Sequence, residues 1–137
     1  MVYVFDASFV GALIIPDEIN PGVEEIYSGI GEDEIFAPQL LWYEVANIFN
    51  NLLRRRRHNY NEVRQLIPAL AAIRLKTDFE TGAVYSEKLL RLCTEYNLSS
   101  YDIAYLELAE RKKAILCTLD GGLQTAAKKH GIAIATR

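Results

Sequence analysis

The sequence predicts an α/β fold in which a parallel sheet is covered by helices on both faces. Short apolar segments alternate with longer segments that carry helical periodicity, and this alternation is typical of parallel sheets with crossover helices. Two of the apolar segments end in an aspartate, Asp6 and Asp120. The chain has 137 residues, 50% hydrophobic and 24% charged, which predicts one globular domain spanning residues 1–137.

Five short apolar segments predict the strands. Each is bounded by proline, glycine or charged residues, and they span residues 3–5, 34–38, 73–77, 114–120 and 132–136. Pro38 closes the second segment, because a residue before proline rarely continues a regular element. The third segment, IRLKT, alternates apolar and polar residues as a half-buried strand does.

The segments between the strands predict the helices. They span residues 7–15, 22–31, 39–57, 60–72, 78–96, 97–114 and 121–131. Ser8 is expected to cap the first helix, and Ser99 or Ser100 the sixth, because a hydroxyl can accept from an otherwise unpaired backbone N–H. Pro16 ends the first helix, and Pro68 bends or restarts the fourth.

The two strand-end aspartates point to a ligand site. In parallel sheets, ligands bind outside the carboxyl ends of the strands, and this is where Asp6 and Asp120 are expected. The first fifty residues contain nine acidic residues and no Lys or Arg, so Asp6 has no nearby cation in sequence. Residues 51–137 carry a net charge of +6, which favours a nucleic-acid or acidic partner there.

Two further acids lie on apolar helix faces. Glu44 is one turn from Leu41 and Ile48, although a surface glutamate should lie on the opposite side of the helix. A carboxylate that reaches the rim of the core, or that pairs with an arginine, would explain Glu44 equally well. For Asp102 alone a first-turn interaction with the helix dipole is the simpler explanation, and for Asp120 alone a turn.

Taken together, the four acids predict a site for a hard divalent cation. Mg²⁺ binds carboxylates, waters and phosphate oxygens, and a bound ion removes the repulsion between crowded carboxylates. No His or Cys accompanies them, which disfavours zinc. His58 and His130 lie among basic residues, where solvated positions at helix ends are expected. The pattern suits metal-assisted phosphodiester hydrolysis, in which Mg²⁺ or Mn²⁺ activates water.

The remaining composition narrows the class of protein. No apolar run approaches the ~20 residues of a membrane span, and no signal peptide precedes Asp6. Cys93 and Cys117 lack metal-site or disulfide spacing, so both are expected to be buried thiols. These features predict a cytoplasmic protein that does not bind a membrane.

Four segments resemble, in order and rough spacing, the acidic motifs of PIN-domain ribonucleases: VFDAS, LWYEVANIF, LSSYDIAYLELA and LCTLDGGLQTAAKKHGI. The resemblance covers nearly the whole chain, whose length is that of VapC-type toxins of prokaryotic toxin–antitoxin pairs. It implies a three-layer α/β/α sandwich with a parallel five-stranded sheet. It also implies Mg²⁺- or Mn²⁺-dependent endoribonuclease activity on RNA, a cognate antitoxin protein and a homodimer.

The resemblance also assigns residues. Asp6, Glu44 and Asp102 match the acids that form the core of the metal site, and Asp120 matches a fourth acid that acts through water. Residues at matching positions around these acids are Ser8, Asn47 and Thr118. Helix capping, a surface amide and strand packing are the respective alternatives for these three.

A basic run and several aromatic residues are candidates for RNA binding. The run ends the helix that carries Glu44 and consists of Arg54, Arg55, Arg56 and Arg57, followed by His58. It would guide phosphates toward the acids, or simply favour the helix C-terminus. Trp42, Tyr43 and Tyr101 would stack on unpaired bases, or belong to the core.

Two other classes of function are open on the sequence. A receiver-like signalling domain also binds Mg²⁺ through acids, and Asp78 would be its phosphoacceptor. The chain ends IATR without the lysine expected after the last strand of a receiver, and Glu44 would be unexplained. A catalytically silent PIN-fold binding module is the other alternative, against which the intact acids count.

Overall fold

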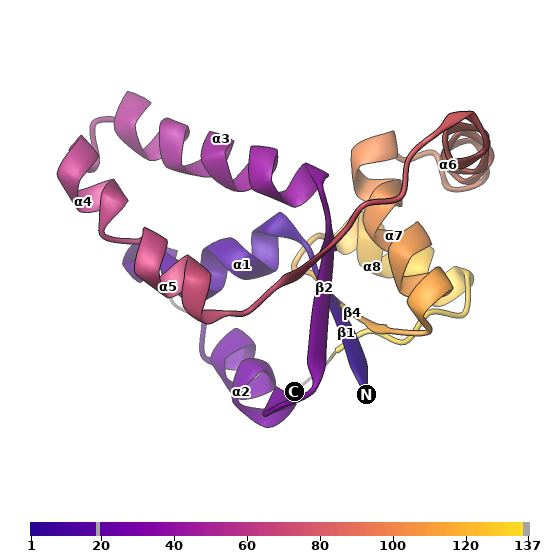
Figure 1. The fold of residues 1–137 in the computed structure, drawn as a ribbon, viewed down its shortest axis with the longest axis horizontal. Coiled ribbons are helices and arrows are strands. Elements are labelled where there is room, and N and C mark those ends of the chain that lie inside the picture. Colours follow the sequence, from indigo (N-terminus) through magenta and orange to yellow (C-terminus); the bar gives the residue numbers. More distant parts are fainter. Residues whose placement is uncertain (19, 136–137) are drawn as a thin grey trace.

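Four parallel strands form the centre of the computed structural model, which describes residues 1–18 and 20–135 (Figure 1). The strands are β1 (Val2–Phe5), β2 (Glu34–Pro38), β3 (Lys76–Asp78) and β4 (Ile115–Cys117). Their order across the sheet is β3-β2-β1-β4, and every pair is parallel. The carboxyl ends of all four strands therefore meet at one edge of the sheet.

Helices flank this sheet on both sides. They are α1 (Ala7–Ile14), α2 (Pro21–Ile30), α3 (Leu40–Arg54), α4 (Tyr60–Arg64), α5 (Ile67–Ala72), α6 (Ala83–Tyr96), α7 (Ser100–Lys112) and α8 (Gly121–Lys129). Figure 1 shows α1, α2 and α5 on one side of the sheet, and α6, α7 and α8 on the other. The chain between β2 and β3 extends outward through α3 and returns through α4 and α5.

The predicted fifth strand at 132–136 is wrong for the residues that the structure describes. Leu116 and Ile134 form a single parallel bridge, with bonds from the Leu116 N–H to the Ala133 carbonyl and from the Ala135 N–H to the Leu116 carbonyl. Because β4 is only three residues long, it offers little ladder for a further strand. Residue 136 lies outside the described residues.

Several element boundaries also differ from prediction. The strand predicted at 73–77 begins at Lys76, because Arg74 adopts a φ of +58° and turns the chain before it. The helix predicted at 78–96 begins only after Gly82, whose φ is +108°. The helix predicted at 60–72 is two helices, and Pro68 lies in the first turn of the second, where its missing N–H costs nothing.

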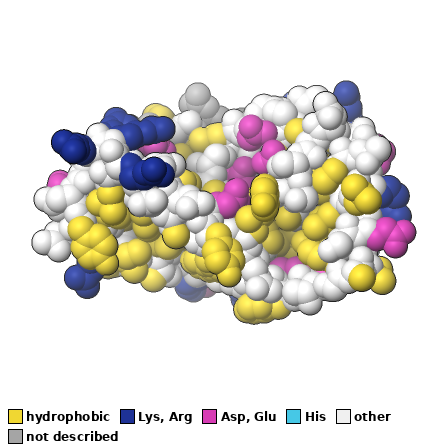
Figure 2. Space-filling model, turned by 90° about the horizontal axis from the view of Figure 1, so that it is seen from above, with side chains coloured by type: hydrophobic (Ala, Val, Ile, Leu, Met, Phe, Trp, Pro, Cys, Tyr) yellow, Lys and Arg dark blue, Asp and Glu magenta, His cyan; other side chains and the backbone are white. Residues whose placement is uncertain are grey.

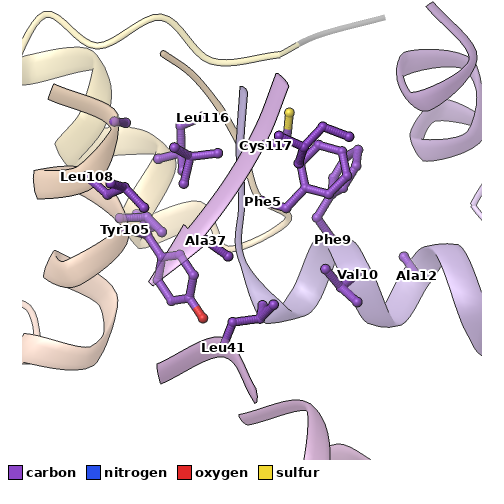
Figure 3. Close-up of a cluster of buried hydrophobic side chains, with 14 of the residues drawn as sticks. Phe5, Phe9, Val10, Ala12, Ala37, Leu41, Tyr105, Leu108, Leu116 and Cys117 are labelled. Carbon is purple, nitrogen blue, oxygen red and sulfur yellow. The ribbon is translucent and has the colours of Figure 1, made fainter. Parts of the chain in front are cut away.

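The hydrophobic core lies on both faces of the sheet. Val4, Phe5 and Leu116 are completely buried in the central strands. In the close-up of Figure 3, Tyr105 and Leu108 of α7 lie on one side of the strands, and Phe9 and Val10 of α1 on the other. All residues from 103 to 109 of α7 are buried, so this helix is held more completely by the core than any surface helix would be.

Two predictions of absence can be compared with the structure. None of the helices in the described ranges has the length and apolar character needed to cross a bilayer. Cys93 and Cys117 are both free thiols, the first partly exposed and the second buried.

Candidate active site

Asp6 follows β1 directly and is only 6% exposed. Its Oδ1 accepts hydrogen bonds from the Phe9 backbone N–H (3.0 Å) and the Ser8 hydroxyl (2.7 Å), and its Oδ2 accepts one from the Thr118 hydroxyl. Asp6, not Ser8, is therefore the N-cap of α1. The prediction of Ser8 as the cap is wrong because the strand delivers the carboxylate to the capping position first.

Ser8 and Thr118 hold Asp6 against the end of β4. The Ser8 hydroxyl, which donates to Asp6, also accepts from the Leu119 N–H (3.0 Å). Thr118 is buried, and its hydroxyl accepts from the Asp120 N–H (3.0 Å) while donating to Asp6. The two hydroxyl residues thus tie the ends of β1 and β4 together around one carboxylate.

Glu44 lies on α3 and is partly buried. Its Oε1 accepts a hydrogen bond of 2.5 Å from the hydroxyl of Tyr105, which is 2% exposed. The arginine partner that would explain Glu44 as a structural ion pair is absent from the described residues, since the salt bridges there do not include Glu44.

Asp102 and Asp120 lie at the starts of two helices. Ser99 caps α7, as one of the two predicted alternatives, and its Oγ accepts from the Asp102 N–H (3.3 Å). Asp120 caps α8, and its Oδ2 accepts from the Leu123 N–H (2.7 Å). Both carboxylates are therefore oriented by the positive ends of helices at the carboxyl edge of the sheet.

These four residues, Asp6, Glu44, Asp102 and Asp120, form what we call the acidic cluster. Burial raises the pKa of Asp6 despite its hydrogen bonds, and the nearby Asp120 raises it further. Burial also raises the pKa of Glu44, with added repulsion from Asp6 and Asp102. The pKa of Asp102 is raised by burial and by Asp120. The pKa values of three of the four acids are therefore raised, mainly by burial and in part by other acids of the cluster.

No cation within the described ranges compensates this repulsion, because none of the salt bridges there involves a member of the acidic cluster. Figure 2 shows acidic side chains gathered near the centre of one face, with basic side chains grouped toward one end of it. Asp6 is buried, Glu44 and Asp102 are partly buried and Asp120 is exposed. A buried carboxylate without a cationic partner, such as Asp6, is costly. A bound cation would remove that cost.

The donor set fits a hard divalent ion such as Mg²⁺ or Mn²⁺. It consists of carboxylate oxygens from a strand end, a helix face and two helix starts. Oδ1 of Asp6 already accepts two hydrogen bonds, whereas Oδ2 of Asp6, Oε1 of Glu44 and Oδ2 of Asp120 each accept one in the described residues and retain a lone pair. As the side chains stand, no three His, Cys, Asp or Glu residues in the part of the chain that the structure describes converge closely enough to hold an ion. Binding would therefore need the carboxylates to draw together.

Other predicted residues lie farther from the acidic cluster. Asn47 is exposed, and within the described residues it makes no hydrogen bond to any of the four acids. The exposed residues of the basic run are Arg54, Arg55, Arg56 and Arg57. Arg54 is ten positions after Glu44, or about 15 Å along a helix at 1.5 Å per residue.

The aromatic candidates are on the surface. Trp42, Tyr43 and Tyr101 are 39%, 73% and 63% exposed, so their alternative assignment to the core is wrong. The Trp42 ring N–H is oriented by a hydrogen bond to the Thr77 hydroxyl (2.8 Å).

Tyr105 was not among the predicted site residues. It stands three positions after Asp102, so both side chains lie on one side of α7, although SYDIAYLELA reads as an apolar helix face. A tyrosine on such a face needs a partner for its hydroxyl when it is buried. The hydroxyl of Tyr105 on an apolar helix face, one turn after Asp102, was therefore a sequence feature from which Tyr105 could have been proposed as a site residue.

Comparisons with known proteins identify the family of this chain. Residues 3–134 match the PIN domain. A relative, ribonuclease VapC3 of Pyrobaculum aerophilum, is 29% identical over 120 residues, covering 88% of this chain and 90% of that protein. This identity establishes a distant relationship.

Solved structures share the fold. PAE2754 from Pyrobaculum aerophilum has a TM-score of 0.74 at 22% identity over 98% of this chain and 83% of its own. VapBC2 from Rickettsia felis, bound to a DNA fragment from their promoter, has a TM-score of 0.70 at 11% identity over 98% of both chains. Mycobacterium tuberculosis VapC20, a sarcin-ricin loop cleaving toxin, has a TM-score of 0.68 at 17% identity over 100% of both chains. The chain therefore belongs to the PIN-domain family and is distantly homologous to the VapC ribonuclease toxins.

Proposed function

We propose that this protein is a metal-dependent endoribonuclease that hydrolyses phosphodiester bonds in RNA. The observation that carries the proposal is the placement of the acidic cluster: Asp6 follows β1, Asp102 and Asp120 lie at helix starts, and Glu44 is bonded to the buried Tyr105. None of the four has a cationic partner in the described residues. Structural stability alone gives no reason to retain such an arrangement. Binding of a divalent cation would give such a reason.

The acidic cluster would hold Mg²⁺ or Mn²⁺, with Asp6, Glu44 and Asp102 as the core and Asp120 acting through water. The ion would stabilise charge on the scissile phosphate and lower the pKa of a water molecule. Ser8 and Thr118 orient Asp6 through its two carboxylate oxygens. In this mechanism the protein positions the carboxylates, and a water molecule, not a side chain, is the nucleophile.

The basic run at the end of α3 would collect RNA before cleavage. Its arginines are exposed, and within the described residues none forms a salt bridge to an acid. Free arginines favour phosphate binding, whereas the acidic cluster alone would repel the backbone. The proposed path for RNA runs along α3 from the basic run toward Glu44.

We also propose that the protein is the toxin of a toxin–antitoxin pair and forms a homodimer. The named relatives VapC3 and VapBC2 support an antitoxin partner. Large apolar side chains are exposed along α3, α4 and α5, as expected of a chain that binds other proteins, and they include Trp42, Tyr43, Tyr60 and Ile67. Light scattering of the purified protein would test the homodimer.

Replacement of one carboxylate tests the proposed activity. Asp6→Asn should abolish Mn²⁺-dependent cleavage of RNA and relieve any growth arrest caused by expression. Asp33→Asn removes an exposed acid outside the acidic cluster and should cleave as wild type does. Retained cleavage by a folded Asp6→Asn protein would exclude the mechanism, and failure of the wild-type protein to bind Mn²⁺ in calorimetry would favour a silent binding module.

A receiver-like function has little support in the geometry. Asp78 would have to be a free phosphoacceptor, but Arg111 donates to both of its carboxylate oxygens (2.9 and 2.7 Å). Its strand, β3, is also at the edge of the sheet, whereas the receiver order 2-1-3-4-5 places the third strand in the centre.

A further inference from the structure

A hollow lies between the start of α3, the loop after β3, and the first turns of α6 and α7. Two of these helices also carry acids of the acidic cluster, Glu44 on α3 and Asp102 on α7. Its volume is about 300 Å³, at the small end of the range for ligand sites. Tyr101, which immediately precedes Asp102, lines it, and so does Leu40, one turn before Glu44. An RNA strand with a phosphate at the acidic cluster would therefore bring a neighbouring base to this hollow.

The surface of the hollow suits a flat, uncharged ring. Tyr101 is 63% exposed, and its ring is flanked in the lining by Leu40 and the partly buried Tyr85. Aromatic rings stack on nucleobases regardless of sequence. Among the described residues no Lys or Arg lines the hollow, so a phosphate placed there would find no lining cation among them.

The polar groups of the lining add selectivity. Glu80 is exposed, and within the described residues its carboxylate forms no salt bridge. The loop that carries it is fixed, because Asp78 accepts from the Glu80 N–H (3.4 Å) and is itself held by Arg111. Gln39 lines the same hollow with an amide that can donate or accept.

A carboxylate and an amide in the lining of one hollow match one base better than the others. Guanine presents two adjacent donors, its ring N–H and its amino group, which a carboxylate can accept together, and beside them an acceptor oxygen suited to Gln39. On the corresponding Watson–Crick edge, adenine, cytosine and uracil each place an acceptor next to their donor. The acceptor would face the Glu80 carboxylate and repel it.

We propose that this hollow binds an unpaired guanine next to the scissile phosphate, with Tyr101 as the stacking surface and Glu80 as the residue that selects the base. This inference rests on the proposed ribonuclease function and names the sequence feature that the site would read. Glu80 and Tyr101 would then determine where RNA is cut, while the acidic cluster determines whether it is cut.

Binding can be measured without cleavage by using the Asp6→Asn protein. Fluorescence anisotropy with short single-stranded RNAs, identical except for one guanine or adenine, should show tighter binding of the guanine form. Glu80→Gln in the same background should reduce that preference about 5-fold or more. Tyr101→Ala should weaken both RNAs about 5-fold or more. Glu87→Gln, an exposed acid on α6 outside the hollow, should change neither.

Cleavage then gives an independent measurement. Sequencing the ends produced from a randomised RNA pool should show guanine enriched at one position beside the cut, and this enrichment should be lost in Glu80→Gln while its Mn²⁺ affinity is unchanged. Equal binding of the two RNAs, or a preference that survives Glu80→Gln, would overturn the inference. A wild-type protein that binds guanine selectively but cuts no RNA would instead contradict the proposed function.

Discussion

Helix α7 carries acids in two opposite electrostatic environments. At its start Asp102 belongs to the acidic cluster, which has no cationic partner in the described residues. Farther along, Glu107 pairs with Arg111 (2.9 Å) and Lys88 (3.1 Å), and Glu110 pairs with Lys88 (3.2 Å) and His130. Arg111 extends the pairing to Asp78. We call this second group the ion-pair network.

The pKa values of Asp78 and Glu110 in the ion-pair network are lowered, whereas those of Asp6, Glu44 and Asp102 in the acidic cluster are raised. The hydrogen bond from Arg111 lowers the pKa of Asp78. Burial would raise the pKa of Glu110, but hydrogen bonds from His130 and Lys88 lower it overall. Burial does not separate the groups, since Glu107 is 1% exposed and Asp6 is 6% exposed. The two groups differ in their cationic partners. The buried Glu107 of the ion-pair network is paired with Arg111 and Lys88, whereas the buried Asp6 of the acidic cluster has no cationic partner in the described residues.

The sharpest test of this difference compares Glu107→Gln with Asp102→Asn. Glu107→Gln leaves Arg111 and Lys88 without their buried partner, and the free energy of unfolding should fall by about 3 kcal/mol. Asp102→Asn relieves repulsion, and its unfolding free energy should be unchanged or higher. Urea denaturation at pH 7 in a chelator measures both. Equal losses in the two variants would erase the distinction between the groups.

Addition of Mn²⁺ should affect only the acidic cluster. At a free concentration 100 times Kd, the ion should stabilise the wild-type fold by about 2.7 kcal/mol, measured as an increase in Tm. Asp102→Asn should lose this increase, whereas Glu107→Gln should retain it from a lower starting Tm. An increase that survives Asp102→Asn would place the ion elsewhere.

Two tyrosines allow the same comparison with a smaller change. Tyr105→Phe removes the hydrogen bond to Glu44, and Tyr96→Phe removes the one to His130 (2.5 Å). Each should lower the unfolding free energy by about 1 kcal/mol. Only Tyr105→Phe should also weaken Mn²⁺ binding in calorimetry, by about 10-fold, because partners that orient ligands affect metal affinity to this extent. Equal Mn²⁺ affinities for the two variants would show that Glu44 needs no orientation.

The pH dependence of stability without metal should be the smallest effect. Asp6, Glu44 and Asp102 have raised pKa values, so their contribution to stability is present below the ordinary carboxyl pKa of about 4 and is lost as pH rises through the raised values. Asp78 and Glu110 behave oppositely, and their contribution is lost as pH falls through the lowered values.

Two variants separate these slopes in chelator. Asp102→Asn should reduce the loss of stability between about pH 4 and 7, and Asp78→Asn should reduce the loss below about pH 4. Urea denaturation across this range measures both. A wild-type protein whose stability rises steadily from pH 4 to 7 would contradict the raised pKa values.

The sequence predicted several features of the fold that depend on local chemistry, although the cap of α1 was assigned to Ser8 instead of Asp6. Apolar strand segments, a capping Ser99 and a restart at Pro68 all reflect interactions within a few residues, and each is present in the structure. The fifth strand failed because pairing depends on the length of its neighbour, β4, which residues 132–135 do not encode. The positive φ of Arg74 likewise shifted the start of β3 without a glycine to signal it.

In the candidate site, too, features of the local sequence could be recognised, whereas contacts between distant residues could not. Acids that follow strands or lie on apolar helix faces could be recognised in the sequence, and their joint role in one site stays a prediction. The contact of Tyr105 with Glu44 joins residues 61 positions apart, so spacing along the chain could not predict it. His130 was expected to be solvated, but it is 17% exposed between Tyr96 and Glu110, which come from two other helices.

The capping role of Asp6 restricts how this position can change during evolution. One carboxylate oxygen holds the first turn of α1 while the other reaches Thr118, so the length of the side chain is fixed as well as its charge. Glutamate preserves the charge but is not among the residues that cap helices well. Asparagine preserves the cap but loses the charge. Aspartate satisfies both demands, so these two substitutions lose either the helix cap or the negative charge.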